Sequence, residues 1–171
     1  VPLESGYAVD LQSRFEAPSG PITLGKTNFG FLGVRVAKTI SEQFGGGRLT
    51  SAEGGLGEDA IFGKPSRWVD YSGPTKPDVV EGIAYLDHPQ NPNHPTHWHV
   101  RRDGWFSASF CLTGPSGLAA DHPIDLRYRL WVHSGAANPE AINRAWADFS
   151  ETPAYVLRTG RGVFPTIERA S

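Results

Sequence analysis

The chain has 171 residues, of which 39% are hydrophobic and 20% are charged, and its formal net charge is −2. This length suits one domain with a full hydrophobic core, and the composition is typical of a soluble globular protein. The charge argues against a nucleic-acid partner, because nucleic-acid surfaces show a basic excess. No run reaches the roughly 18 apolar residues of a membrane helix, so we expect no membrane insertion.

The 20 glycines and 14 prolines predict short strands joined by tight turns. The single cysteine, Cys111, excludes an internal disulfide and leaves a cytoplasmic, periplasmic or secreted location open. We interpret it as a small buried residue. A chain that begins at Val1 and contains no methionine is expected to be a processed or excised piece of a longer protein.

The first half of the chain alternates apolar and polar residues in several short segments, the pattern of half-buried strands. Strands are expected at 7–16, 22–24, 29–37 and 67–73, with turns at 18–21 and 45–47 and a surface loop at 53–57. Two charges on these strands, Arg35 and Asp70, have mostly apolar or aromatic neighbours and are candidate ligand-binding residues. Trp68 shares the face of Asp70.

The second half continues this pattern. It predicts a loop at 74–78 and strands at 81–88, 96–102, 105–111 and 124–133. Asp103-Gly104 is a two-residue hairpin signal. On the last of these strands, Arg127 and Arg129 are expected on a solvated face with cross-strand ion pairs.

One helix is expected at about 138–150. Asn138 is a good N-cap, Pro139 suits the first helical position, and Ile142, Trp146 and Phe149 follow as one apolar stripe. Together the elements predict one all-β domain over residues 1–171 with a single short helix.

Four of the six histidines fall within 87–101. If 96–102 is extended, His97, His99 and Arg101 share one face. The proline-rich loop before this strand is expected to bring the other two histidines over the same surface. We therefore predict that this stretch is the functional site.

Two kinds of chemistry fit these residues. His97 and His99 are suitably spaced to bind a divalent metal ion such as Cu, Fe or Zn, with a third ligand from His88, His94, Asp87 or Asp103. Without a metal, a histidine is the natural proton donor or acceptor near neutral pH. Arg101 then stabilises negative charge.

The candidate catalytic residues are His97, His99, Arg101 and Asp87. The candidate ligand-binding residues are His88, Asn91, His94, Trp98, Trp68, Asp70 and Arg35. Asp87 is expected to orient an imidazole or to act as the base itself. The tryptophans offer flat faces for a sugar ring, although burial in the core is the commoner role of this residue.

Five segments resemble one known family. They are FGFLGVRVA (29–37), RWVDYSG (67–73), EGIAYLDHPQNPNHPTHWHVR (81–101), DGWF (103–106) and LRYRLWVHSG (126–135). They are similar to the DUF6807 family, which carries the automatic label "methane oxygenase PmoA". Members are larger, and the resemblance, which covers most of residues 5–150, implies that this chain is their C-terminal half or a shortened member. The label does not fit, because a membrane methane oxygenase subunit needs spanning helices.

The resemblance implies an antiparallel β-sandwich similar to the galactose-mutarotase class, whose members bind or transform carbohydrates. We therefore expect a carbohydrate-binding protein or an enzyme with acid–base chemistry on a sugar. A metal-dependent oxygenase or hydrolase and a non-catalytic binding module are the alternatives. Expected partners are a small-molecule or carbohydrate ligand, and either a separate N-terminal half or a second copy.

Overall fold

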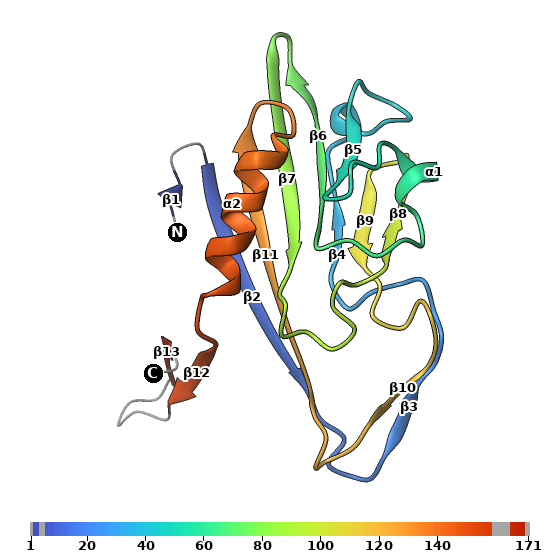
Figure 1. The fold of residues 1–171 in the computed structure, drawn as a ribbon, viewed down its shortest axis with the longest axis vertical. Helices are drawn as coiled ribbons and strands as arrows, with labels where there is room; N and C mark the ends of the chain where they lie inside the picture. Colours follow the sequence, from blue (N-terminus) through green and yellow to red (C-terminus); the bar gives the residue numbers. More distant parts are fainter. Residues whose placement is uncertain (1, 4–5, 159–164, 170–171) are drawn as a thin grey trace.

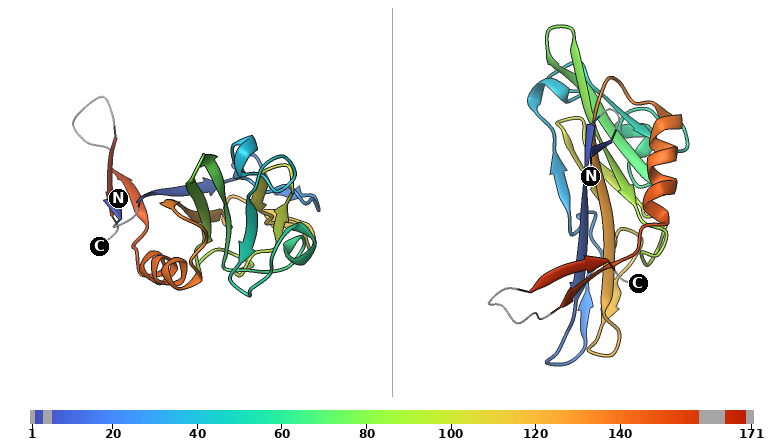
Figure 2. Two further views of the ribbon diagram at one scale, coloured as in Figure 1. Left: turned by 90° about the horizontal axis from the view of Figure 1, so that it is seen from above. Right: turned by 90° about the vertical axis from the view of Figure 1, so that its left-hand side faces the viewer.

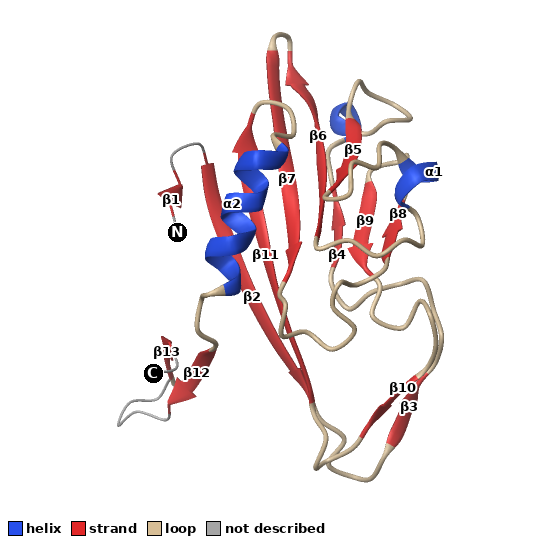
Figure 3. Cartoon of the chain, viewed as in Figure 1, coloured by secondary structure: helices blue, strands red, loops and turns tan. Residues whose placement is uncertain are grey.

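A computed structural model describes residues 2–3, 6–158 and 165–169. It is all-β and antiparallel, with one long helix, as the sequence predicts (Figure 3). None of the described helices is long and apolar enough to cross a membrane.

A six-stranded sheet forms the centre of the molecule (Figure 1). Its strands, in spatial order, are β1 (Pro2–Leu3), β2 (Gly6–Phe15), β11 (Ile124–Ser134), β7 (Val79–Asp87), β6 (Trp68–Lys76) and β5 (Arg48–Ser51). The alternation along β6 and β11 sends successive side chains to opposite faces of this sheet. Both faces therefore carry apolar side chains, and other elements must pack on each face to shield these side chains from water.

A three-stranded sheet covers one face of the large sheet. It consists of β4 (Gly33–Arg35), β9 (Trp105–Ala108) and β8 (Trp98–Val100). Between the two sheets, the Tyr85 ring makes edge-on contacts with the rings of Trp98 and Phe106, with centroid distances of 4.9 Å and 5.9 Å. All three side chains are fully buried, so the core of a β-sandwich lies here.

Helix α2 (Pro139–Ser150) covers the opposite face of the large sheet (Figure 1). Its N-cap is as predicted, since Asn138 Oδ1 accepts a hydrogen bond from the Ala141 amide at 3.1 Å. Ile142 and Phe149 of the predicted stripe pack with Trp68 and other apolar residues of the sheet in a second buried cluster.

The remaining elements are short. A ribbon joins β3 (Ile22–Leu24) and β10 (Ser116–Leu118), and a C-terminal hairpin joins β12 (Tyr155–Arg158) and β13 (Thr166–Arg169). A 3-10 turn, η1 (Lys38–Ile40), and a one-turn helix, α1 (Glu58–Ile61), flank β5.

Several element predictions were wrong in extent. The predicted strands at 96–102 and 105–111 are reduced to Trp98–Val100 and Trp105–Ala108. The predicted loop at 74–78 is largely strand, because β6 runs to Lys76 and the hairpin turns at Pro77-Asp78, where Asp78 takes a positive φ of 60°. The predicted strand at 29–37 is reduced to Gly33–Arg35. Gly30 lies so close to β9 that a Cβ there would stand 1.9 Å from the Ala108 carbonyl oxygen, and the chain bends at this point.

The prediction for the two arginines of β11 was partly wrong. Arg129 makes the expected cross-strand ion pair with Asp10 at 2.6 Å, and also pairs with Asp148 of α2 at 2.8 Å. However, Arg127 and Arg129 are buried, not solvated. Helix α2 covers them, and both guanidinium groups lie over the Phe149 ring.

Candidate functional site

The three-stranded sheet has an outer face that is turned away from the core. The pairing of His99 with Ser107, next to Trp98 with Ala108, sends His99 outward and Trp98 inward. The alternation continues to half-buried His97 and exposed Arg101. We call the surface made by His97, His99, Arg101, Trp105 and Arg35 the outer face. The predicted sharing of one face by His97, His99 and Arg101 matches this register.

His99 is the buried histidine of the outer face. The rings of Phe29 and Phe62 contact the His99 ring edge-on, with centroid distances of 5.0 Å and 5.5 Å. The centroid of the Trp105 ring lies 6.4 Å from that of His99. Burial lowers its pKa, and the nearby positive charge of Arg101 lowers it further. The imidazole is therefore neutral at pH 7, and its Nδ1 atom is buried without a hydrogen-bond partner.

An aspartate joins the two arginines of the outer face. Asp103 Oδ2 lies 2.9 Å from Arg101 Nη2 and 3.7 Å from Arg35 Nη1. The Arg35 guanidinium in turn lies 5.8 Å from the centre of the Trp105 ring. Asp103 Oδ1 and Trp105 Nε1 are both buried without a partner.

Glycine at position 33 makes room for this indole. Gly33 pairs with Ser107 of β9, two residues after Trp105. A Cβ at Gly33 would lie 2.0 Å from the Trp105 ring, so only glycine leaves space for the ring at this position.

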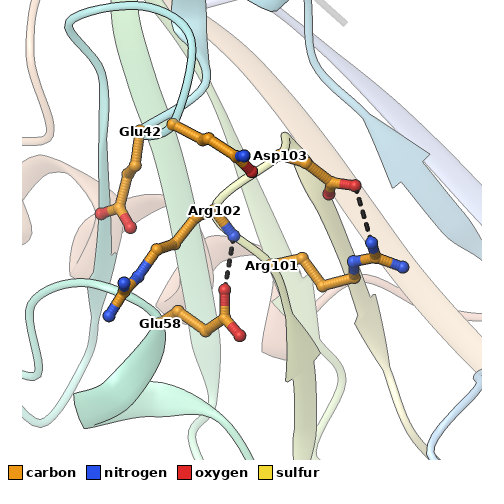
Figure 4. Close-up of a pocket in the computed structure, with 6 residues that line it drawn as sticks. Glu42, Glu58, Arg101, Arg102 and Asp103 are labelled. Atoms are coloured by element: carbon orange, nitrogen blue, oxygen red, sulfur yellow. Dashed lines mark hydrogen bonds and ion pairs between the residues drawn. The ribbon is translucent and has the colours of Figure 1, made fainter.

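A cavity of about 530 Å³ opens beside Arg101 and Asp103 (Figure 4). Its lining residues are Glu42, Gln43, Glu58, Arg101, Arg102 and Asp103. Glu58 accepts a hydrogen bond from the Arg102 amide at 2.6 Å, and Arg102 also pairs with Asp59. The cavity thus presents carboxylates and guanidinium groups together.

A buried tyrosine fixes the two loops that line the cavity. The Tyr71 hydroxyl donates to the Arg102 carbonyl at 3.0 Å and accepts from the Glu42 amide at 2.8 Å. Burial raises the pKa of Tyr71 to about 12, so the phenol stays neutral. Glu42 itself accepts from the Leu49 amide at 2.9 Å. The cavity therefore has a rigid base.

The sequence did not single out Glu42, Gln43, Glu58 or Arg102. They come from the η1–β5 connection, α1 and the turn after β8, and no spacing rule links these segments. The only local signal was the Asp103-Gly104 hairpin, which places Asp103 next to Arg101.

The loop between β7 and β8 forms a second polar group around Asp87. This carboxylate is fully buried and accepts hydrogen bonds from Asn91 Nδ2 at 2.7 Å and from the Thr96 amide at 2.9 Å. Its Oδ2 also lies 2.8 Å from His94 Nδ1. We call Asp87, His88, Asn91, His94 and Thr96 the Asp87 loop. Asp87 therefore orients an imidazole, as one of the predictions stated.

Helix α2 covers the Asp87 loop. The His94 ring stacks on Trp146, with centroids 6.0 Å apart and planes 16° apart, and Trp146 Nε1 donates to the Asp87 carbonyl at 2.9 Å. His88 is fully buried edge-on against Phe149. Burial lowers the pKa of His88 to about 4, and the Arg127 charge contributes. His88 is thus a neutral core residue.

The structure divides the predicted site instead of gathering it. No side-chain hydrogen bond, ion pair or ring contact in the described part of the chain joins the Asp87 loop to the outer face. Trp98 and Trp68 are fully buried, and their indole nitrogens donate to the Ser66 carbonyl and to Asn143. Neither indole is accessible to a ligand.

Asp70 also lies away from the outer face. It is fully buried beneath α2, where its Oδ2 lies 2.7 Å from His133 Nε2. Burial raises the pKa of Asp70, and the hydrogen bond from His133 opposes this shift. Cys111 is buried, as predicted.

Within residues 2–3, 6–158 and 165–169, no three His, Cys, Asp or Glu side chains come together as a group that could hold a metal ion. His97 and His99 share a face, but the proposed third ligands are engaged elsewhere. Asp87 pairs with His94, and Asp103 pairs with two arginines.

The comparison with family models gives one match. The model described as a family of unknown function (DUF6807) matches residues 1–147. The chain therefore belongs to this family. No curated protein and no solved structure matches it.

Proposed function

We propose that this family member binds a neutral carbohydrate on the outer face, beside the cavity of Arg101 and Asp103. The observation that carries this proposal is a gathering of three buried polar atoms without hydrogen-bond partners: His99 Nδ1, Trp105 Nε1 and Asp103 Oδ1. Each such atom costs about 1–3 kcal/mol. A ligand that supplies hydroxyl groups at this place recovers that cost.

The remaining unpartnered buried atoms of the described residues lie elsewhere. They belong to Arg67, Asp70, His88 and Trp131. Arg67 lies over Trp146, His88 packs on Phe149, and Trp131 belongs to the cluster beneath α2. Protein encloses these groups, whereas Asp103 is 20% exposed at the mouth of the cavity. Among the residues with such atoms, Asp103 is the one that lines the cavity, and His99 and Trp105 lie on the outer face beside it.

The chemistry of these atoms favours hydroxyl groups. An indole N–H only donates and an ionised carboxylate only accepts, whereas a sugar hydroxyl does both. Aromatic surface for the apolar side of a sugar ring is present nearby, since Phe29 is 56% exposed and Phe62 is 42% exposed. A carbohydrate combines these two requirements.

The balance of charge favours a neutral ligand. Glu42, Glu58 and Asp103 face Arg101 and Arg102 around the cavity (Figure 4), and both arginines already have acidic partners. An anionic sugar would meet uncompensated carboxylates, whereas a neutral sugar can hydrogen-bond to both signs of charge.

A catalytic role on the same ligand is a second candidate. His99 is neutral at pH 7, and its Nδ1 has no protein partner, so it is suited to accept a proton from a bound sugar. Arg101 is the adjacent group that would stabilise the negative charge that develops. If the protein binds a sugar but does not convert it, the non-catalytic binding module is the alternative that remains.

A screen of neutral and acidic monosaccharides and oligosaccharides by calorimetry tests the proposal. We expect binding of a neutral sugar, weakened at least about 10-fold by Arg101→Ala, because one charge-assisted hydrogen bond is worth about 1.5–3 kcal/mol. Arg14→Ala is the matched control, since Arg14 is a similarly exposed, ion-paired arginine on β2. No sugar binding, or an equal loss in both variants, would overturn the proposal.

The metal alternative stays a prediction, and metal analysis of tag-free protein tests it. A metal site at His97 and His99 requires near-stoichiometric metal that disappears in the His97→Ala/His99→Ala double variant, because removing ligands abolishes binding. Less than about 0.1 metal per chain, unchanged in the double variant, would exclude it.

A further inference from the structure

Two residues belong both to the cavity and to the outer face or its border. Arg101 and Asp103 line the cavity. Arg101 is also part of the outer face, and Asp103 pairs with Arg35 of that face at 3.7 Å. In Figure 4 the Arg101–Asp103 pair lies on one side of the cavity and Glu58 lies on the other. The cavity and the outer face therefore form one continuous surface that meets at Arg101 and Asp103.

Helix α1 connects the cavity and the outer face a second time. It packs beside β8, on the side of the molecule away from α2 (Figure 2). Its first residue, Glu58, lines the cavity, and the residue that caps its end, Phe62, contacts the His99 ring. The Phe62 amide donates to the Glu58 carbonyl at 2.8 Å, so the two residues are one helical turn apart. Side chains in this relation lie on the same side of a helix, with Cβ atoms about 5–6 Å apart. An aromatic ring and a carboxylate are thus placed next to each other.

The cavity and the outer face differ in chemistry. Every residue that lines the cavity is polar or charged: Glu42, Gln43, Glu58, Arg101, Arg102 and Asp103. The outer face is bordered instead by the exposed rings of Phe29 and Phe62, which contact His99. The apolar side of a sugar ring rests on aromatic rings, whereas its hydroxyl groups bond to carboxylates and guanidinium groups. The two places therefore suit two different contacts of a carbohydrate.

The site is larger than one sugar ring. The cavity alone has about 530 Å³, which lies within the range of about 300–1,000 Å³ for pockets that hold drug-sized molecules. A monosaccharide is smaller than such a molecule. The rings of Phe29 and Phe62 are not among the residues that line the cavity, so the aromatic surface adds to this space. A ligand that contacts both places needs at least two rings.

We infer that the site binds a neutral oligosaccharide of at least two sugar rings. One ring rests on Phe29 and Phe62. The next ring enters the cavity beside Glu58, and the linkage between the two rings lies at Arg101 and Asp103. The two-ring assignment depends on the proposed function, because both concern the same surface, and it adds a minimum length and an order of contacts.

Calorimetry with sugars of increasing length tests the two-ring assignment. The probes are glucose, galactose, mannose and xylose, each compared with its α- and β-linked disaccharides. A bound monosaccharide contacts the aromatic rings of the outer face, whereas a disaccharide also enters the cavity. We expect the disaccharide to bind at least about 10-fold more tightly than the monosaccharide it contains.

Two protein variants locate the two rings. Glu58→Gln keeps an acceptor for the Arg102 amide and removes the negative charge. Because hydrogen bonds to a charged group are the stronger ones, this variant should reduce the advantage of the disaccharide over the monosaccharide to about 2-fold or less. Phe29→Ala removes aromatic surface and should weaken binding of both sugars about 5-fold or more.

Two matched variants lie outside the site. Glu53→Gln changes an exposed glutamate of the loop before α1 that does not line this cavity. Phe44→Ala changes a ring that is 55% exposed, against 56% for Phe29. Neither variant should alter sugar binding. Circular dichroism checks that every variant is folded.

The possible results separate the two-ring assignment from the proposed function. Absence of binding by any sugar would overturn both. Equal affinity for the monosaccharide and its disaccharides would overturn the two-ring assignment and leave the proposed function standing. A tighter disaccharide whose affinity is unchanged in Glu58→Gln or in Phe29→Ala would overturn the assigned positions of the rings.

Discussion

The Asp87 loop and the outer face use similar residues in different ways. Both have histidine close to an aspartate, Asp87 in the loop and Asp103 beside the outer face, and all their residues except Arg35 come from the stretch 87–105. In the Asp87 loop the carboxylate accepts from an amide side chain and a backbone N–H and pairs with His94. On the outer face, Asp103 leaves one carboxylate oxygen unpartnered next to a cavity.

This difference separates a structural cluster from the proposed binding surface. A buried polar group that is fully hydrogen-bonded within the protein has nothing left for a ligand, and its role is to fix the chain. A group that lacks a partner at the mouth of a cavity is available. Clusters of histidine and aspartate in a sequence do not distinguish the two cases, because both contain the same residue types.

The largest predicted effect separates the two aspartates. Asp87→Ala leaves buried donors of Asn91 and Thr96 without their acceptor, so we expect it to reduce the free energy of unfolding by about 3–5 kcal/mol. Asp103→Ala should cost about 1 kcal/mol or less, because Arg101 and Arg35 remain solvated. Urea unfolding measures both, and equal losses would contradict the distinction.

The next effect concerns pH and His88. Its pKa of about 4 in the folded protein lies below the ordinary 6.5, so below pH 6.5 the unfolded chain binds a proton that the folded chain does not. His88 by itself therefore lowers the free energy of unfolding by about 2 kcal/mol between pH 7 and 5, whereas His133, whose pKa is raised, acts in the opposite direction. The pKa of buried His99 shifts in the same direction as that of His88.

His88→Asn should remove most of this pH dependence, because Asn keeps an acceptor for the Gln90 amide but does not titrate. His122→Asn is the control, since His122 is 83% exposed. Urea unfolding at the two pH values compares the variants. A steep pH dependence that survives His88→Asn would show that another group carries it.

A smaller effect tests whether α2 supports only the Asp87 loop. Asn138→Ala removes the N-cap of α2 and should cost about 1 kcal/mol of stability. Trp146 and Phe149 connect this helix to the loop. Hydrogen exchange in the loop should rise, and sugar affinity on the outer face should stay unchanged. A loss of sugar affinity would show that the two regions are coupled.

The smallest stability effect is expected for Arg101. Its side chain is 48% exposed, so Arg101→Ala should change the free energy of unfolding by no more than about 0.5 kcal/mol. Arg127→Ala is the buried counterpart and should cost about 3 kcal/mol, because its guanidinium bonds to Gln90 and to the Thr152 carbonyl beneath α2. Thermal unfolding compares the two arginines.

Local patterns predicted much of the fold. The alternation of β6 and β11 and the cap at Asn138 depend on neighbours a few residues away, and the structure confirms them. The hairpin predicted at Asp103-Gly104 is also present, but Arg101 pairs with Trp105, so its turn has three residues and not the predicted two. The alternation also placed His97, His99 and Arg101 on one face of the chain. These features follow from backbone geometry, which sequence spacing specifies directly.

Burial was not predictable in the same way. Trp68 and Trp98 were candidates for ligand stacking, and Arg127 was expected in solvent, but packing against α2 or between the two sheets buries all three. Which face of a strand is covered depends on elements that lie far away in the sequence. Glu42 and Glu58 reach the cavity for the same reason, since folding brings their two segments to Arg102 in the turn after β8.

The sequence by itself determined the all-β class, the position of the helix, and the row of His97, His99 and Arg101. Only the tertiary structure decided that Asp87 and His94 form a closed structural group, and that Arg101 and Asp103 line a cavity. The physical reason is that hydrogen-bond satisfaction is a property of three-dimensional neighbours, whereas alternation and capping are properties of the local chain.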